Sequence, residues 1–263
     1  MRAPRAQGRR PAVLVAVAAC LITLIGCGKG NPGAAAPQAT TARGAAPAPT
    51  TPGGQGRTPS ASAQDAFAAA VNLKPSDVPG FRASSRAKQA TTPAEEQLVR
   101  ELGKCAGGLG GALGSGDRSS PQFQRHVNVL QIGVSSGVSF LGSAAGGVAQ
   151  LAVLRSPRTR GCLGHYLQRL LESQHYGAAK VTHVQVTQGS PPAAGTAGGF
   201  GWRLTADFTL HGLNVPFYLD ILGFVYQRSE VTLTSSGEVF PFPATIEEQL
   251  FELLLSRARS HRI

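Results

Sequence analysis

The feature that most constrains this chain is a run of thirty-five residues, 28–62, that can bury almost nothing. It consists mainly of Ala, Pro, Gly, Thr and Ser, and it contains no Val, Leu, Ile or aromatic residue. Such a segment cannot offset the conformational entropy that ordering would cost. We therefore predict a disordered linker here and expect one folded domain over residues 63–263.

The chain before the linker has the pattern of an export signal. Residues 1–10 are basic and residues 11–26 are apolar, which is shorter than the roughly 20 residues of a membrane-spanning helix. The end of this run, Leu24-Ile25-Gly26-Cys27, resembles the bacterial lipobox, which implies that Cys27 receives a diacylglycerol and becomes the new N-terminus. A weaker match ends at Cys20, and an uncleaved signal anchor is the other alternative.

This interpretation predicts a signal peptide over 1–26 and a lipidated Cys27 that begins a linker over 27–62. Two or more acyl chains hold a protein stably on a membrane. We therefore expect the protein at the cell membrane, lipid-anchored on the extracytoplasmic face. The membrane is then its first partner.

Two cysteines, Cys105 and Cys162, remain for the domain. In an oxidising compartment they are expected to pair, closing a loop of about 58 residues. Metal ligation is the alternative, but there is no C-x-x-C pattern or nearby cluster of histidines. We predict a disulfide.

The charge of the domain is mild. The whole chain carries a formal net charge of +11, but seven basic residues lie before residue 63 and leave +4 for the remainder. A nucleic-acid-binding domain is usually far more basic. We therefore expect no nucleic-acid partner.

The first half of the domain is predicted to be mainly helical. We expect a short helix over 64–71, an extended stretch over 73–81, a strand over 127–134 and helices over 143–154 and 161–173. Thr92-Pro93-Ala94-Glu95 fits a capping box with Pro at the first helical position, so another helix should begin there and reach Cys105. The spacing of Leu98, Leu102 and Cys105 places that cysteine on the buried face.

The second half is predicted to be mainly strands. Apolar residues alternate with polar ones over 200–210, as in an antiparallel strand with one wet side. Further strands are expected over 180–188, 215–225 and 231–234, and an amphipathic helix from residue 243 onward. The fold class is therefore α+β: an antiparallel sheet of about five strands with helices packed on one face.

Several short motifs carry a family resemblance. They are LKPSDVPGF over 73–81, Ser120-Pro121 with Phe123, a cysteine-bearing helix after LAVLRSP, and PFP before the last helix. Together they resemble a group of actinobacterial secreted lipoproteins related to the extracellular sensor domain of mycobacterial kinase H, whose fold is similar to PsbP/Mog1-like modules. The resemblance implies an extracytoplasmic binding or sensing module and supplies no catalytic site.

Catalytic and metal-binding motifs are weak. Gly133-Val134-Ser135-Ser136-Gly137 fits the G-x-S-x-G nucleophile elbow, which makes a Ser hydrolase a remote alternative. The six histidines are dispersed and make no H-E-x-x-H. We predict no enzyme activity, no catalytic residue, no metal and no cofactor.

The function expected from the sequence is ligand or partner binding. A basic group that could meet an anionic cell-wall polymer, a lipid or an envelope protein comprises Arg155, Arg158, Arg160 and Arg169. The alternative is a lipid or glycolipid carrier, in which the apolar face bearing Phe217, Leu219 and Ile221 opens as a cavity beneath a helix. A cavity of several hundred cubic ångströms would favour the carrier.

Overall fold

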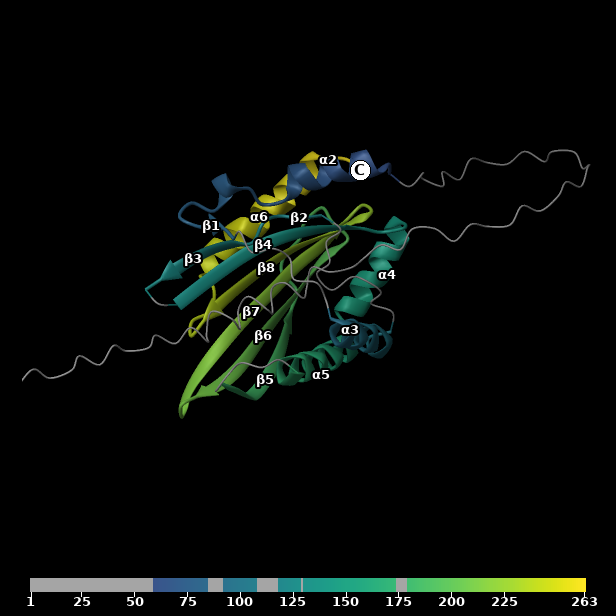
Figure 1. The fold of residues 1–263 in the computed structure, drawn as a ribbon. Coiled ribbons are helices and arrows are strands. Elements are labelled where there is room, and N and C mark those ends of the chain that lie inside the picture. Colours follow the sequence, from purple (N-terminus) through teal and green to yellow (C-terminus); the bar gives the residue numbers. More distant parts are fainter. Residues whose placement is uncertain (1–58, 85–91, 108–117, 129, 174–178) are drawn as a thin grey trace, which may run out of the picture.

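One curved antiparallel sheet organises the protein (Figure 1). The structure is a computed structural model, which describes residues 59–84, 92–107, 118–128, 130–173 and 179–263. The strand order is β1-β3-β4-β8-β7-β6-β5, and β2 pairs with β4. The strands are β1 (Arg82–Ala83), β2 (Arg118–Ser119), β3 (Phe123–Val127), β4 (Leu130–Phe140), β5 (Lys180–Gly189), β6 (Gly198–Leu210), β7 (Leu213–Tyr226) and β8 (Ser229–Glu238).

The α+β class and the antiparallel sheet are confirmed, but the sheet has eight strands rather than about five. The additional strands lie on the β4 side. The predicted strand over 127–134 is confirmed only in part: residues 130–134 lie in β4, but Val127 ends β3, because Asn128 adopts a positive φ of 59° and the chain turns there. The two-residue strands β1 and β2 are too short to show an alternating pattern.

The described residues form five helices: α2 (Ala61–Val71), α3 (Pro93–Cys105), α4 (Ala144–Leu154), α5 (Pro157–Ser173) and α6 (Ala244–Ser260). Four of them pack on the sheet, and α3 packs on α5. A short 3₁₀ turn, η1, spans Pro75–Asp77. Side-chain hydroxyls cap several helix starts, as where Ser60 accepts a hydrogen bond from the amide of Ala63. Helix α2 thus begins two residues inside the segment predicted as linker.

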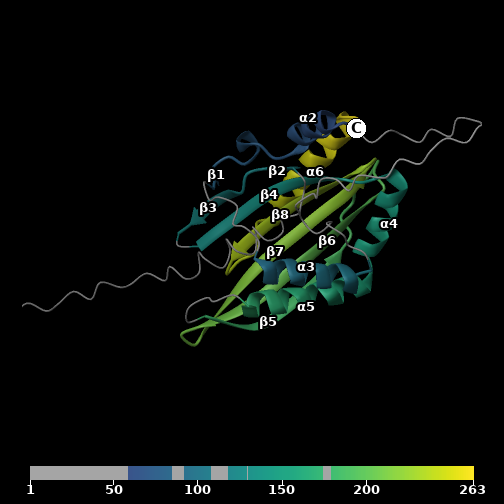
Figure 2. The ribbon, with the colours of Figure 1, turned by 45° about the vertical axis from the view of Figure 1, so that its right-hand side comes forward.

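The expectation that helices cover only one face is wrong. Alternate residues of β7 face opposite ways, so Leu219 and Ile221 join one apolar cluster while Leu222 and Phe224 join another. Figures 1 and 2 show α3, α4 and α5 on one side of the sheet and α2 with α6 on the other. The central strands are buried on both faces, which the one-sided alternation of β6 did not reveal.

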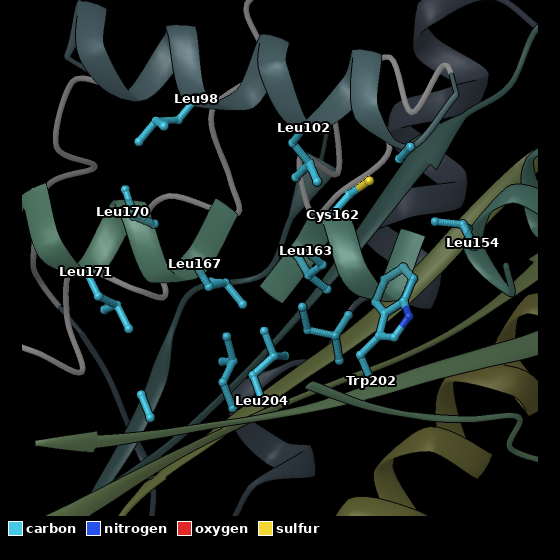
Figure 3. Packing of buried hydrophobic residues seen from close by; sticks show 14 of the residues in the cluster. Leu98, Leu102, Leu154, Cys162, Leu163, Leu167, Leu170, Leu171, Trp202 and Leu204 are labelled. Atoms are coloured by element: carbon cyan, nitrogen blue, oxygen red, sulfur yellow. The ribbon is translucent and has the colours of Figure 1, made fainter. Parts of the chain in front are cut away.

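The first face carries a core between α5 and strands β5 to β7 (Figure 3). Leucines along α5 point at the sheet, and Trp202 and Leu204 of β6 point back at them. Helix α3 lies over α5 on the outside, contributing Leu98 and Leu102. The α3 capping box forms as predicted, with Thr92 and Glu95 exchanging hydrogen bonds.

The second face is covered by α6, which inserts Leu250, Phe251 and Leu254 against β7 and β8. Arg257 near the end of α6 makes a bidentate ion pair with Asp77 of η1, with N–O distances of 2.7 and 2.8 Å. Burial acts to raise the pKa of Asp77, but the hydrogen bonds from Arg257 and Lys74 and the charge of Arg257 outweigh it and lower that pKa. This pair fastens the start of the domain to its last helix.

Candidate functional site

A groove of about 420 Å³ lies where the covered part of the second face meets its uncovered part. Helix α6 covers β7 and β8 but not β6 and β5, so the surface is hollowed beside the first turn of α6. We call this hollow the α6 groove, and its walls are residues 187–191 with Gly201, Trp202, Arg203, Asp220, Leu222 and Glu247. Its volume is within the range of small-molecule sites.

Three neighbouring strands place a row of polar side chains along the groove. In the strand register Arg203 of β6 stands opposite Asp220 of β7, and Asp220 stands opposite Ser235 of β8. The Arg203 guanidinium donates from Nε and Nη2 to the two Asp220 carboxylate oxygens over 2.7 and 2.8 Å. The Asp220 side chain is 4% exposed and that of Arg203 is 46% exposed, so the cation shields the carboxylate from water.

Helix α6 adds a second carboxyl group, that of Glu247, above this row. The chain folds back closely between β8 and α6. A Cβ on Gly237 of β8 would lie 2.1 Å from the Phe240 carbonyl oxygen, so only glycine fits there. The Glu247 side chain is buried, and its Oε1 accepts a hydrogen bond from the Ser235 hydroxyl. The groove thus combines one cation with two carboxyl groups.

The Glu247 carboxyl is poised between its two protonation states at neutral pH. Burial raises its pKa to about 7, the charge of Asp220 acts in the same direction, and the Ser235 hydrogen bond and Arg203 oppose them. Titratable groups perturbed in this way are enriched at functional sites.

Arg203 and Glu247 each keep one polar atom that makes no hydrogen bond to any described residue. The Arg203 contacts use Nε and Nη2 and leave Nη1, while the Glu247 contact uses Oε1 and leaves Oε2. Both residues line the hollow. The groove therefore offers a ligand a cationic donor and a carboxyl oxygen.

The floor of the groove is low because two glycines pair across it. Gly189 of β5 stands opposite Gly201 of β6, on the face that also bears Arg203. A Cβ on Gly189 would meet no atom within 4 Å, so space remains above it. Leu222 and Pro191 supply apolar surface beside these glycines.

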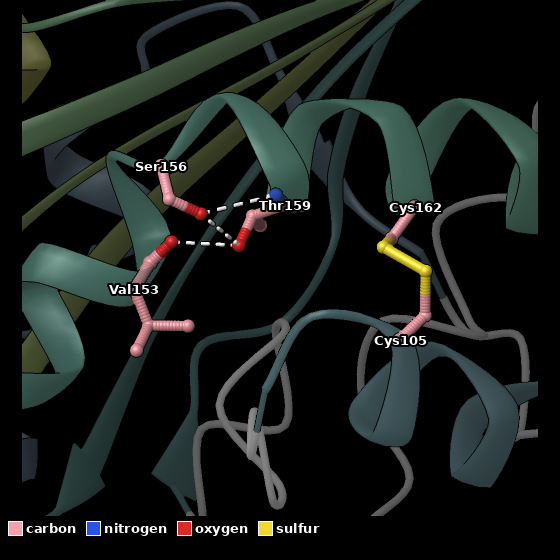
Figure 4. Close-up of a disulfide and its surroundings, with 5 residues drawn as sticks. All are labelled: Cys105, Val153, Ser156, Thr159 and Cys162. Carbon is pink, nitrogen blue, oxygen red and sulfur yellow. Dashed lines mark hydrogen bonds between the residues drawn. A yellow bond between two sulfur atoms is a disulfide. The ribbon is translucent and has the colours of Figure 1, made fainter.

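The predicted disulfide joins Cys105 to Cys162 and links α3 to α5 (Figure 4). Cys162 is buried, but Cys105 is exposed, so the prediction that it lies on the buried face is wrong. The α3 residues that meet α5 are Leu98 and Leu102, and the cysteine extends from the end of that face. Cys27, the predicted lipidation site, lies outside the described residues.

The four arginines of the predicted anionic-partner patch are not equivalent. Arg155 donates from Nε to the Gly199 carbonyl over 2.7 Å, and Arg169 pairs with Glu101 of α3 over 2.7 Å. Arg158 and Arg160 are exposed in the first turn of α5. Nine residues of helix, about 14 Å, separate Arg169 from Arg160, so Arg169 stands apart from the other three.

The G-x-S-x-G motif does not form a nucleophile elbow. Residues 133–137 lie inside β4, and Ser135 pairs with Thr234 of β8. An elbow requires a sharp turn between a strand and a helix. The motif therefore gives no support for a Ser hydrolase.

The apolar face proposed for a carrier is filled by α5. Phe217, Leu219 and Ile221 are each at most 4% exposed. The hollow beside Phe217 and Leu219, beneath α5, holds about 10 Å³, which is the space of one water molecule. A lipid chain needs far more, so this arrangement does not favour the carrier.

Sequence reasoning missed the α6 groove. Neither Glu247 nor Arg203 was among the candidate residues predicted from the sequence. The register could have been found, because a two-residue turn at His211 and Gly212 places Arg203 opposite Asp220. The position of α6 over Arg203 and Asp220 could not be predicted, because an amphipathic pattern does not say which strands a helix covers.

No protein-family model matches the chain, and no curated protein matches it significantly.

Within the described ranges, no helix is long and apolar enough to cross a membrane. The same residues contain no group of three or more His, Cys, Asp or Glu side chains that could hold a metal ion.

Proposed function

We propose that this chain is a membrane-tethered extracytoplasmic lipoprotein that acts as a ligand- or partner-binding module through the α6 groove. The observation that carries the binding role is the buried Glu247 carboxyl with its unused Oε2 in a hollow of about 420 Å³. Because this oxygen is not enclosed by protein atoms, a ligand in the hollow can form a hydrogen bond with it.

Three features of the sequence support the tether. A basic head, a short apolar run and the lipobox-like residues before Cys27 support export and acylation. A linker of about 35 residues, at roughly 3 Å each when extended, then gives the domain a reach on the order of 100 Å. The binding site is thereby free to meet components of the envelope, such as a wall polymer, a lipid or another protein.

Intact mass spectrometry of protein taken from the membranes of its native host tests the tether. The expected mass corresponds to cleavage before Cys27, a diacylglycerol adduct on that cysteine and two hydrogens missing at Cys105 and Cys162. A mass that retains residues 1–26, or that lacks the adduct, removes the anchoring part of the proposal.

Site-specific photo-crosslinking in the native host tests the binding part. Thr187 is exposed on the rim of the groove, and Val148 is exposed on α4 at a distance from it. A photoreactive phenylalanine at 187 should give a discrete adduct that the same residue at 148 does not give. Equal labelling at the two positions, or none at 187, contradicts a binding role for the groove.

A further inference from the structure

The charges of the α6 groove restrict what it can bind. The Arg203 cation is already neutralised by Asp220, and Glu247 adds a second acid close to both. An anionic ligand would meet two carboxyl groups, and a cationic ligand would meet the Arg203 guanidinium. Placing either charge beside like charge in a partly buried site is unfavourable, which favours a ligand without net charge.

The two atoms without a hydrogen bond, Nη1 of Arg203 and Oε2 of Glu247, favour a ligand that can both accept and donate hydrogen bonds. Nη1 of Arg203 can only donate, because a guanidinium has no acceptor. Oε2 of Glu247 accepts when the carboxyl is ionised and donates when it is the protonated oxygen. A hydroxyl group serves with either atom and in either protonation state. Adjacent hydroxyl groups on one ligand could therefore engage both side chains.

The remaining walls suit such a ligand. Leu222 and Pro191 offer apolar surface, while residues 187–190 add hydroxyl and backbone groups at the rim. A saccharide ring has C–H faces that can pack on Leu222 and Pro191, and hydroxyl edges that can form hydrogen bonds with residues 187–190. Sites that fix small ligands commonly combine apolar walls with a few placed polar groups.

We propose that the α6 groove binds a neutral saccharide, with Arg203 donating to it from Nη1 and Glu247 bonding to it through Oε2. This inference rests on the proposed function and names the ligand class of the same site. It assigns the recognition of hydroxyl groups to two side chains that come from β6 and α6.

Saturation-transfer NMR on the full chain tests this inference. The protein is kept in a detergent without a sugar headgroup, such as lauryldimethylamine oxide. The probes are neutral and acidic oligosaccharide fractions, released from the envelope of the native host by mild hydrolysis and separated by anion exchange. We expect transfer to sugar protons of the neutral fraction and not to those of the acidic fraction.

Three variants locate the binding. Gly189→Leu fills open space in the groove and should abolish the transfer, whereas Gly142→Leu, at another glycine with open space around it, should leave the transfer unchanged. Glu247→Ala removes the Oε2 contact and should weaken binding about ten-fold or more, as expected for a hydrogen bond to a charged group.

Transfer to the acidic fraction alone, to neither fraction, or undiminished transfer in Gly189→Leu overturns the saccharide assignment. These outcomes differ from failure of the proposed function. If crosslinking at Thr187 succeeds and the neutral fraction does not bind, the groove remains a binding site and only its ligand class is wrong. If crosslinking at Thr187 fails as well, the binding role itself is lost.

Discussion

Glu230 offers the sharpest test of the energetics derived from this structure. It lies at the start of β8, is 1% exposed, and accepts a hydrogen bond from the Gln150 side chain over 2.6 Å. Burial raises the pKa of Glu230 to about 8, and the Gln150 hydrogen bond only partly opposes this. The native protein therefore carries this carboxyl as the neutral acid at pH 7.

The sign of the effect follows from proton binding in the two states. Below the ordinary pKa of 4.5, Glu230 is protonated in both the folded and unfolded chains and contributes no pH dependence. Between pH 4.5 and about 8 only the folded chain keeps the proton, so the free energy of unfolding falls by about 1.4 kcal/mol for each pH unit. At pH 7 the accumulated loss is about 3 kcal/mol, and above pH 8 it no longer grows.

Glu230→Gln removes this loss while keeping a carbonyl acceptor for Gln150. Relative to the unsubstituted protein, the variant should therefore gain about 3 kcal/mol in unfolding free energy between pH 4 and pH 7. Urea denaturation at intervals of one pH unit from 4 to 8 measures the gain. The matched control is Glu252→Gln, at an exposed position of α6, which should show little change with pH. A Glu230→Gln difference that is constant across this range refutes the reasoning.

Two further predictions concern packing and cross-linking. Cys105→Ser with Cys162→Ser opens a loop of about 58 residues and should cost about 4 kcal/mol of stability on the chain-entropy argument; an unchanged urea midpoint against the oxidised protein would count against a stabilising role for the bond. Gly223→Ala places a Cβ 2.3 Å from the Phe200 ring, which should cost about 1–3 kcal/mol. Gly142→Ala has open space and serves as its control in thermal unfolding, and equal stability of the two variants would show that the ring gives way freely.

Local sequence signals predicted local structure well. The capping box at Thr92 placed the start of α3 at Pro93, and the alternation over 200–210 identified β6. These signals succeed because the atoms that determine the structure are close in the sequence. The turn at Asn128 gave no such signal, because it lacks the Gly or Pro that usually marks a hairpin.

The candidate site was harder to foresee because it depends on contacts between distant segments. Arg203 and Asp220 follow from the hairpin register, but Glu247 joins them only through the packing of α6. Its burial, which produces the raised pKa, is a property of the sheet beneath that helix. A first-turn glutamate has the same sequence signature whether it faces water or a groove.

Native mass spectrometry of the protein extracted gently from host membranes tests the central claim most directly. The account predicts a bound small molecule on the unsubstituted chain and on Gly142→Leu, and its loss on Gly189→Leu, where the new side chain occupies the α6 groove. A bound molecule that persists on Gly189→Leu, or a chain that carries none before substitution, would contradict the assignment of this groove as the binding site.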